Sequence, residues 1–127
     1  RQLPGEMNMT TQTANEVYAI VNEAKQAAAI SATKYYNEVL GGRDQLMCGF
    51  AWAKIINVKG STKLGKALIA AGFSKSYSGG LELWNPSGIP CQNMDAKVEG
   101  AKAFIRVLRE KLIVPENVSM YADCRLD

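Results

Sequence analysis

The sequence has 127 residues, a formal net charge of +3, 47% hydrophobic and 21% charged residues, and no histidine. This composition is typical of globular proteins, and the length predicts one domain with a single hydrophobic core. The absence of histidine excludes Ser-His-Asp and Cys-His catalysis, histidine-ligated zinc and a histidine pH switch.

The cysteine spacing and the lack of long apolar runs indicate in which cellular compartment the protein works. The three cysteines are odd in number and include no C-x-x-C pair, which indicates neither a zinc site nor a disulfide framework. No run of about 18 apolar residues and no signal-like segment occurs, so we expect neither export nor a membrane partner. We therefore expect a cytoplasmic protein that needs no metal or cofactor.

Residues 1–9 are interpreted as an N-terminal extension or an expression remnant, and residues 10–127 as the single domain. Cys48 and Cys124 fall in strand-like segments and are expected in the core. Cys91, in a loop, is then the candidate reactive thiol.

A long amphipathic helix is the first predicted element. Thr13 and Glu16 form a capping-box pair, in which a hydroxyl and a carboxylate satisfy backbone amides at a helix start. Apolar residues then recur at helical spacing up to the glycine pair at 41–42, which predicts a helix of about 26 residues within 13–40. Its alanine-rich part, 24–32, favours close packing across a sheet, and an interface with a partner chain is the alternative.

A strand is predicted next, over residues 48–58. Alanines alternate there with larger side chains, so one face is small and suits close helix packing. The other face carries Phe50, Trp52 and Lys54, an aromatic pair followed by a cation.

A second helix is predicted to begin after Lys59 and to end at Gly72, where Phe73 fits the hydrophobic contact of a Schellman ending. A second strand follows over 74–84, and a break at 78–80 is the alternative to a continuous strand.

The loop at 85–90 contains two prolines and a glycine and therefore predicts a tight reversal. A third helix, capped by Asn93 or Asp95, ends before Pro115, and a last strand covers 118–124.

The expected fold class is therefore α+β, in the order α-β-α-β-α-β. Three helices packed on a three- to four-stranded, mostly antiparallel sheet would form one two-layer domain. The sequence contains no linker, repeat or low-complexity tract that would divide it.

Positive charge is concentrated in the middle of the chain. No acidic residue occurs between Asp44 and Glu82, whereas five lysines do: Lys54, Lys59, Lys63, Lys66 and Lys75. A second basic group, Lys102, Arg106 and Arg109, shares one face of the third helix, for which a solvated surface is the commoner explanation.

The second helix start is a candidate phosphate site. A flexible glycine, two hydroxyls and three lysines lie around the expected N-terminus of this helix, where free backbone amides would point at a bound anion. The residues are Lys59, Gly60, Ser61, Thr62, Lys63 and Lys66. The order of these residues along the chain does not match that of a Walker A loop. Ordinary capping by Ser61 or Thr62 would explain the hydroxyls but not the lysines.

The segment 84–88 is a candidate base-binding loop. Trp84 offers a stacking surface beside the polar side chains of Asn85 and Ser87, an arrangement that commonly holds nucleobases. A buried tryptophan that anchors a turn is the alternative.

Candidate general bases are few. Glu82, Asp95, Glu99 and Asp123 show no paired spacing. Asp95 at a helix start is most simply a cap, and Asp123 most simply pairs with Arg125 or a lysine.

Several sequence blocks resemble a family of small uncharacterised proteins encoded by tailed bacteriophages. The blocks are CGFAW at 48–52, KGSTKLG at 59–65, GF at 72–73, LWNPSG at 83–88, QNMDAK at 92–97 with GA at 100–101, and RLD at 125–127. The resemblance implies a phage-encoded protein that works in the bacterial host cytoplasm, and it carries over no catalytic residue.

The leading hypothesis is a non-enzymatic accessory protein that binds a phosphate-bearing ligand, either nucleic acid or a nucleotide. Its predicted site joins the 59–66 helix start to the 84–88 loop, Asn93 and Arg125, if the sheet brings these loops together. One alternative is a small phosphate-ester or nucleotide-processing enzyme that uses Asp95 or Asp123. Another is a structural or partner-binding protein that forms homo-oligomers through the 13–40 helix.

Overall fold

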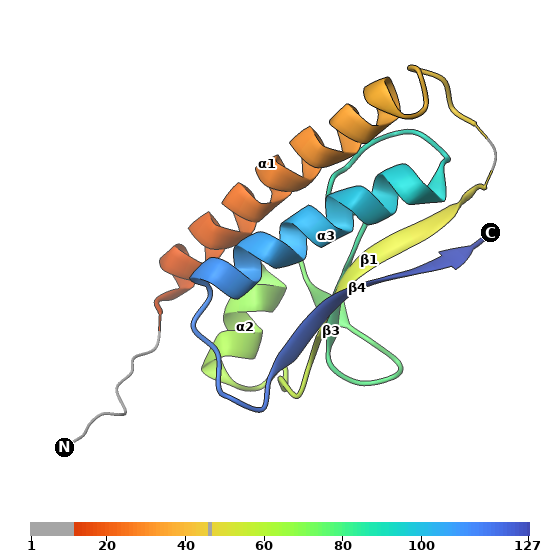
Figure 1. Ribbon diagram of the computed structural model, residues 1–127. Coiled ribbons are helices and arrows are strands. Elements are labelled where there is room, and N and C mark those ends of the chain that lie inside the picture. Colours follow the sequence, from red (N-terminus) through yellow and green to blue (C-terminus); the bar gives the residue numbers. More distant parts are fainter. Residues whose placement is uncertain (1–11, 46) are drawn as a thin grey trace.

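The computed structural model describes residues 12–45 and 47–127 (Figure 1). The interpretation of residues 1–9 lies outside this part of the chain. The elements in order are α1 Ala14–Glu38, β1 Gly49–Ile56, α2 Lys63–Ala70, β2 Ser74–Lys75, β3 Leu81–Trp84, α3 Met94–Lys111 and β4 Ser119–Leu126. The α+β class is confirmed. The predicted second strand is divided into β2 and β3 by the turn that includes Gly79 and Gly80, both at positive φ.

The strands form one antiparallel sheet in the order β2-β3-β1-β4. The central strand β1 pairs with β3 on one side and with β4 on the other, so Trp52 lies between Trp84 and Asp123. Phe50 faces Arg125 in the same ladder. Residues from three distant parts of the sequence therefore become neighbours near the start of β1.

The helices lie on one side of the sheet, and the core fills the space between (Figure 1). Phe104, Ile55, Leu68, Leu81 and Leu108 are among its largest fully buried side chains. The small face of β1 is confirmed, because Ala51, Ala53 and Ile55 are all buried.

The α1 helix runs beside α3 in the opposite direction, with Ser31 hydrogen-bonded to Glu99 and Glu23 paired with Lys111 (Figure 1). Its buried alanines were expected to lie across the sheet, but α1 packs chiefly along α3. A Cβ added at Gly100 of α3 would lie 3.2 Å from the Ala28 carbonyl oxygen. The small residues thus allow two helices, rather than a helix and a sheet, to approach closely.

The predicted helix ends are confirmed. Thr13 and Glu16 form the capping box of α1, Thr62 caps α2 and Asn93 caps α3. At the end of α2 the Phe73 amide donates to the Leu68 carbonyl, which is the long bond of a Schellman ending.

No helix in the described part of the chain is both long and apolar enough to cross a membrane.

The cysteine expectations are wrong. Cys48 and Cys124 are exposed, because Cys48 directly precedes β1 and Cys124 lies on β4, an edge strand of the sheet. Cys91 is buried, and burial is the main cause that raises the pKa of its thiol. It is therefore the least suited of the three to react as a thiolate.

Candidate functional site

We use the term open face for the side of the sheet opposite the helices. Along the strands the open-face positions alternate with core positions, and they are Phe50, Trp52, Lys54, Glu82, Trp84, Tyr121, Asp123 and Arg125. Both tryptophans of the chain are among them.

Three rings form an aromatic cluster on the open face: Phe50, Trp52 and Trp84. The Trp84 ring stacks on Trp52 with a centroid distance of 4.5 Å and an interplanar angle of 22°. It meets Phe50 edge to face, with 5.8 Å between centroids. Trp84 nevertheless stays 43% exposed, so the cluster presents an aromatic surface to solvent.

Two cations flank this cluster. The Arg125 guanidinium lies 5.5 Å from the Phe50 centroid and 5.9 Å from that of Trp84. The Lys97 ammonium lies 5.6 Å from the Phe50 centroid and donates to the Gly49 carbonyl at 2.9 Å. Neither cation forms an ion pair with a carboxylate within residues 12–45 and 47–127. Arg125 is exposed, so its charge is available to an anion that approaches Phe50, whereas the buried ammonium of Lys97 is held by the Gly49 carbonyl.

Lys97 is the residue that sequence reasoning missed. It is only 8% exposed, although buried lysines are rare without a charged partner. Its position in the sequence could have predicted its burial, because Lys97 lies four residues before Ala101 and therefore on the same, buried face of α3. The Gly49 carbonyl and the Phe50 ring together compensate its charge, so Lys97 is buried without a carboxylate partner among the described residues.

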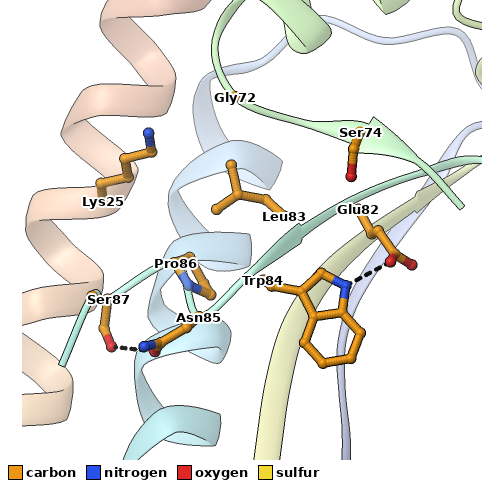
Figure 2. Close-up of a pocket in the computed structure, with 10 residues that line it drawn as sticks. Lys25, Gly72, Ser74, Glu82, Leu83, Trp84, Asn85, Pro86 and Ser87 are labelled. Carbon is orange, nitrogen blue, oxygen red and sulfur yellow. Dashed lines mark hydrogen bonds between the residues drawn. The ribbon is translucent and has the colours of Figure 1, made fainter. Parts of the chain in front are cut away.

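The orientation of Trp84 is fixed by a polar chain. Its indole Nε1 donates to a Glu82 carboxylate oxygen at 2.6 Å (Figure 2). The other Glu82 oxygen lies 3.8 Å from the Lys54 ammonium, which also donates to Ser76 and Ser78 at 2.6 Å. Lys54 thus holds the 76–80 turn directly and the Trp84 indole indirectly, through Glu82.

A cavity of about 590 Å³ adjoins the aromatic cluster where β3 extends past β2. Figure 2 shows Trp84 and Glu82 on one side of it and Lys25 of α1 on the other. Lys25 forms no ion pair in the described part of the chain. Trp84 belongs to both features and joins the cavity to the open face.

The polar side chains of the predicted base-binding loop close the loop itself. Ser87 donates to the Asn85 side-chain oxygen (Figure 2). The Asn85 amide in turn donates to the Ile89 carbonyl. Asn93 accepts the Ala96 amide as a helix cap and is buried. Trp84 is exposed rather than buried, so of the residues predicted in this region Trp84 and Arg125 are the ones that present groups to a ligand.

The predicted phosphate site lies at the other end of β1. Arg125 is paired with Phe50 near the start of the strand, whereas Lys59 follows its end. Eight residues of strand span about 26 Å. The structure therefore divides the predicted loops between two regions: Trp84, Asn93 and Arg125 in one, and the group at 59–66 in the other.

The candidate carboxylates do not assemble. Asp95 is exposed in the first turn of α3, and Asp123 accepts the Cys124 amide at 2.8 Å. Within the described residues no group of three acidic or cysteine side chains is placed to hold a metal ion. The enzymatic alternative stays a prediction that no contact in this region supports.

Comparison of the chain with protein-family models, with curated proteins and with solved structures finds no match in any of the three. Functional inference therefore depends on the geometry of the open face and of the cavities.

Proposed function

We propose that this chain binds single-stranded nucleic acid on the open face of its sheet. The observation that carries the proposal is the aromatic cluster on that face, flanked by the exposed cation Arg125. On the resemblance of its sequence blocks, we further propose that it is a phage-encoded accessory protein that acts in the host cytoplasm.

The chemistry of the cluster matches that of a single strand. An exposed indole stacks on any unpaired base, and each such contact contributes about 1–3 kcal/mol to binding. Arg125 would neutralise the phosphate beside a base held on Phe50 and Trp84. A sheet that carries rings on one face and helices on the other is a common support for unstacked bases.

A strand of several nucleotides fits better than a lone nucleotide. Beyond the aromatic cluster, Tyr121 on the open face is 38% exposed, and Tyr77 in the β2–β3 turn is fully exposed. In the other direction Trp84 leads to the cavity near Lys25. Duplex bases are stacked internally and cannot use these rings, so duplex binding should be weak.

The test uses the fluorescence of the two tryptophans, which both lie in the cluster. Titration with a twelve-nucleotide thymidine or uridine strand should quench the emission, and a duplex or a mononucleotide should do so much less. Trp84→Leu, which keeps Trp52 as the reporter, should weaken binding about 5- to 150-fold, the range that 1–3 kcal/mol allows.

Charge variants locate the strand on the molecule. Arg125→Gln should lower the dependence of log K on log salt by about 0.7, the value for one phosphate contact on a single strand. Arg106→Gln is the matched control, because Arg106 is exposed on α3 on the helical side. If Lys63→Gln weakens binding as much as Arg125→Gln does, the strand follows the α2 start and the proposal is wrong.

A further inference from the structure

A second cavity, of about 400 Å³, lies at the end of the domain opposite the aromatic cluster. It is enclosed by the β1–α2 connection on one side and by the α3–β4 connection on the other. Its lining residues are Gln12, Asn57, Val58, Lys59, Thr62, Lys63, Leu64, Ile113, Pro115 and Val118. It shares no lining residue with the cavity near Trp84, so a ligand bound here would occupy a site separate from the aromatic cluster.

The wall of this cavity is mainly apolar. Val58, Leu64 and Val118 belong to the core or pack against it, whereas Ile113 stays 54% exposed. Concave apolar surface of this size falls in the range of small-molecule sites, about 300–1,000 Å³. At about 30 Å³ for a group the size of a water molecule, it holds about a dozen non-hydrogen atoms.

The neutral polar side chains in the wall already have partners. Gln12 accepts the Ile113 amide and donates to the Lys111 carbonyl, and the Asn57 amide donates to the Asn117 carbonyl. The Thr62 hydroxyl donates to the Lys59 carbonyl and accepts the Gly65 amide. These side chains are thus engaged mainly in holding the backbone around the cavity.

Two cations remain. Lys59 and Lys63 are exposed, and neither forms an ion pair in the described part of the chain. Among the described residues, the lining contains no carboxylate that would neutralise them. The available chemistry is therefore an apolar wall with two positive charges, which selects against cations and against uniformly polar ligands.

We propose that this cavity binds an amphipathic carboxylate, in which an apolar chain of about ten carbon atoms contacts the wall and the anionic head pairs with Lys59 and Lys63. The five lysines of the acid-free segment thus serve different regions. Lys59 and Lys63 bind this ligand, whereas Lys54 holds Glu82 and the β2–β3 turn.

The test titrates the isotope-labelled full chain with decanoate below its micellar concentration and follows backbone amide signals by NMR. Decanoate should shift the signals of Val58, Leu64 and Val118. Decanol, which lacks the charge, should bind about tenfold more weakly, because charge-assisted hydrogen bonds are lost. Acetate and decyltrimethylammonium should leave these signals unchanged.

Variants separate the head from the chain of the ligand. Lys59→Gln combined with Lys63→Gln should weaken decanoate binding about tenfold and leave decanol binding unchanged. Ile113→Asn, at an exposed position, should weaken both ligands. Lys34→Gln on α1 is the matched control for loss of a lysine and should have no effect.

Three outcomes would overturn the proposal. These are equal binding of decanoate and decyltrimethylammonium, shifts that map to the open face instead of the cavity, and no shift at Val58, Leu64 and Val118 at any concentration below the micellar one. Since the oligonucleotide assay reports on Trp52 and Trp84, failure here leaves the proposed function untouched.

Discussion

Replacement of Gly100 by alanine tests the packing that connects the helices to the Trp84 loop. In an exposed helix interior, glycine to alanine would stabilise a protein by about 1 kcal/mol. At Gly100 the added Cβ would lie 2.7 Å from the Ser87 Cβ and 3.2 Å from the Ala28 carbonyl oxygen. Overpacking of this kind costs about 1–3 kcal/mol. The expected net result, the overpacking cost less the propensity gain, is a loss of up to about 2 kcal/mol in the free energy of unfolding.

Urea denaturation followed by circular dichroism measures this loss. A double-mutant cycle with Ser87→Gly separates its two sources, because that change removes the Cβ at 2.7 Å and leaves the Ala28 carbonyl at 3.2 Å. The cost of Gly100→Ala should fall by about 1 kcal/mol in the Ser87→Gly background, within the overpacking range. A gain of about 1 kcal/mol from Gly100→Ala alone, the propensity value, would show that α1, α3 and the loop are not in close contact.

Three further predictions concern single side chains. With a thiol reagent at pH 8, the exposed Cys48 and Cys124 should react rapidly, whereas the buried Cys91 should react only on unfolding. Because burial raises the pKa of the Cys91 thiol, this thiol ionises first in the unfolded state, and the free energy of unfolding should fall as the pH rises past the ordinary thiol pKa. Lys54→Met should lower the free energy of unfolding by about 1–3 kcal/mol, because it leaves Glu82 without its cation and the β2–β3 turn without its donor, and amide hydrogen exchange in that turn should accelerate. Thr62→Ala should cost about 1 kcal/mol in thermal unfolding by removing the cap of α2, and an unchanged midpoint would contradict the hydrogen bond to Gly65.

The local elements and their faces could be predicted from the amino-acid sequence. The capping box at Thr13, the Schellman ending at Phe73 and the alternation around Trp52 depend on residues a few positions apart, and all three are present in the structure. Local hydrogen bonding and side-chain periodicity decide such features before any long-range contact forms. For the same reason the α+β class and the small face of β1 followed from the sequence.

Which side chains meet depends on how the strands and helices assemble, and this could not be predicted from the sequence. Strand order and register place Trp84 on Trp52 and Arg125 beside Phe50, and send Lys59 to the far end of β1. These pairings join segments separated by tens of residues, and no local rule selects among the sheet orders that the same strands allow. The burial of Lys97 likewise depends on where α3 crosses the start of β1. The single phosphate site expected from charge and loop composition thus became two regions of different chemistry.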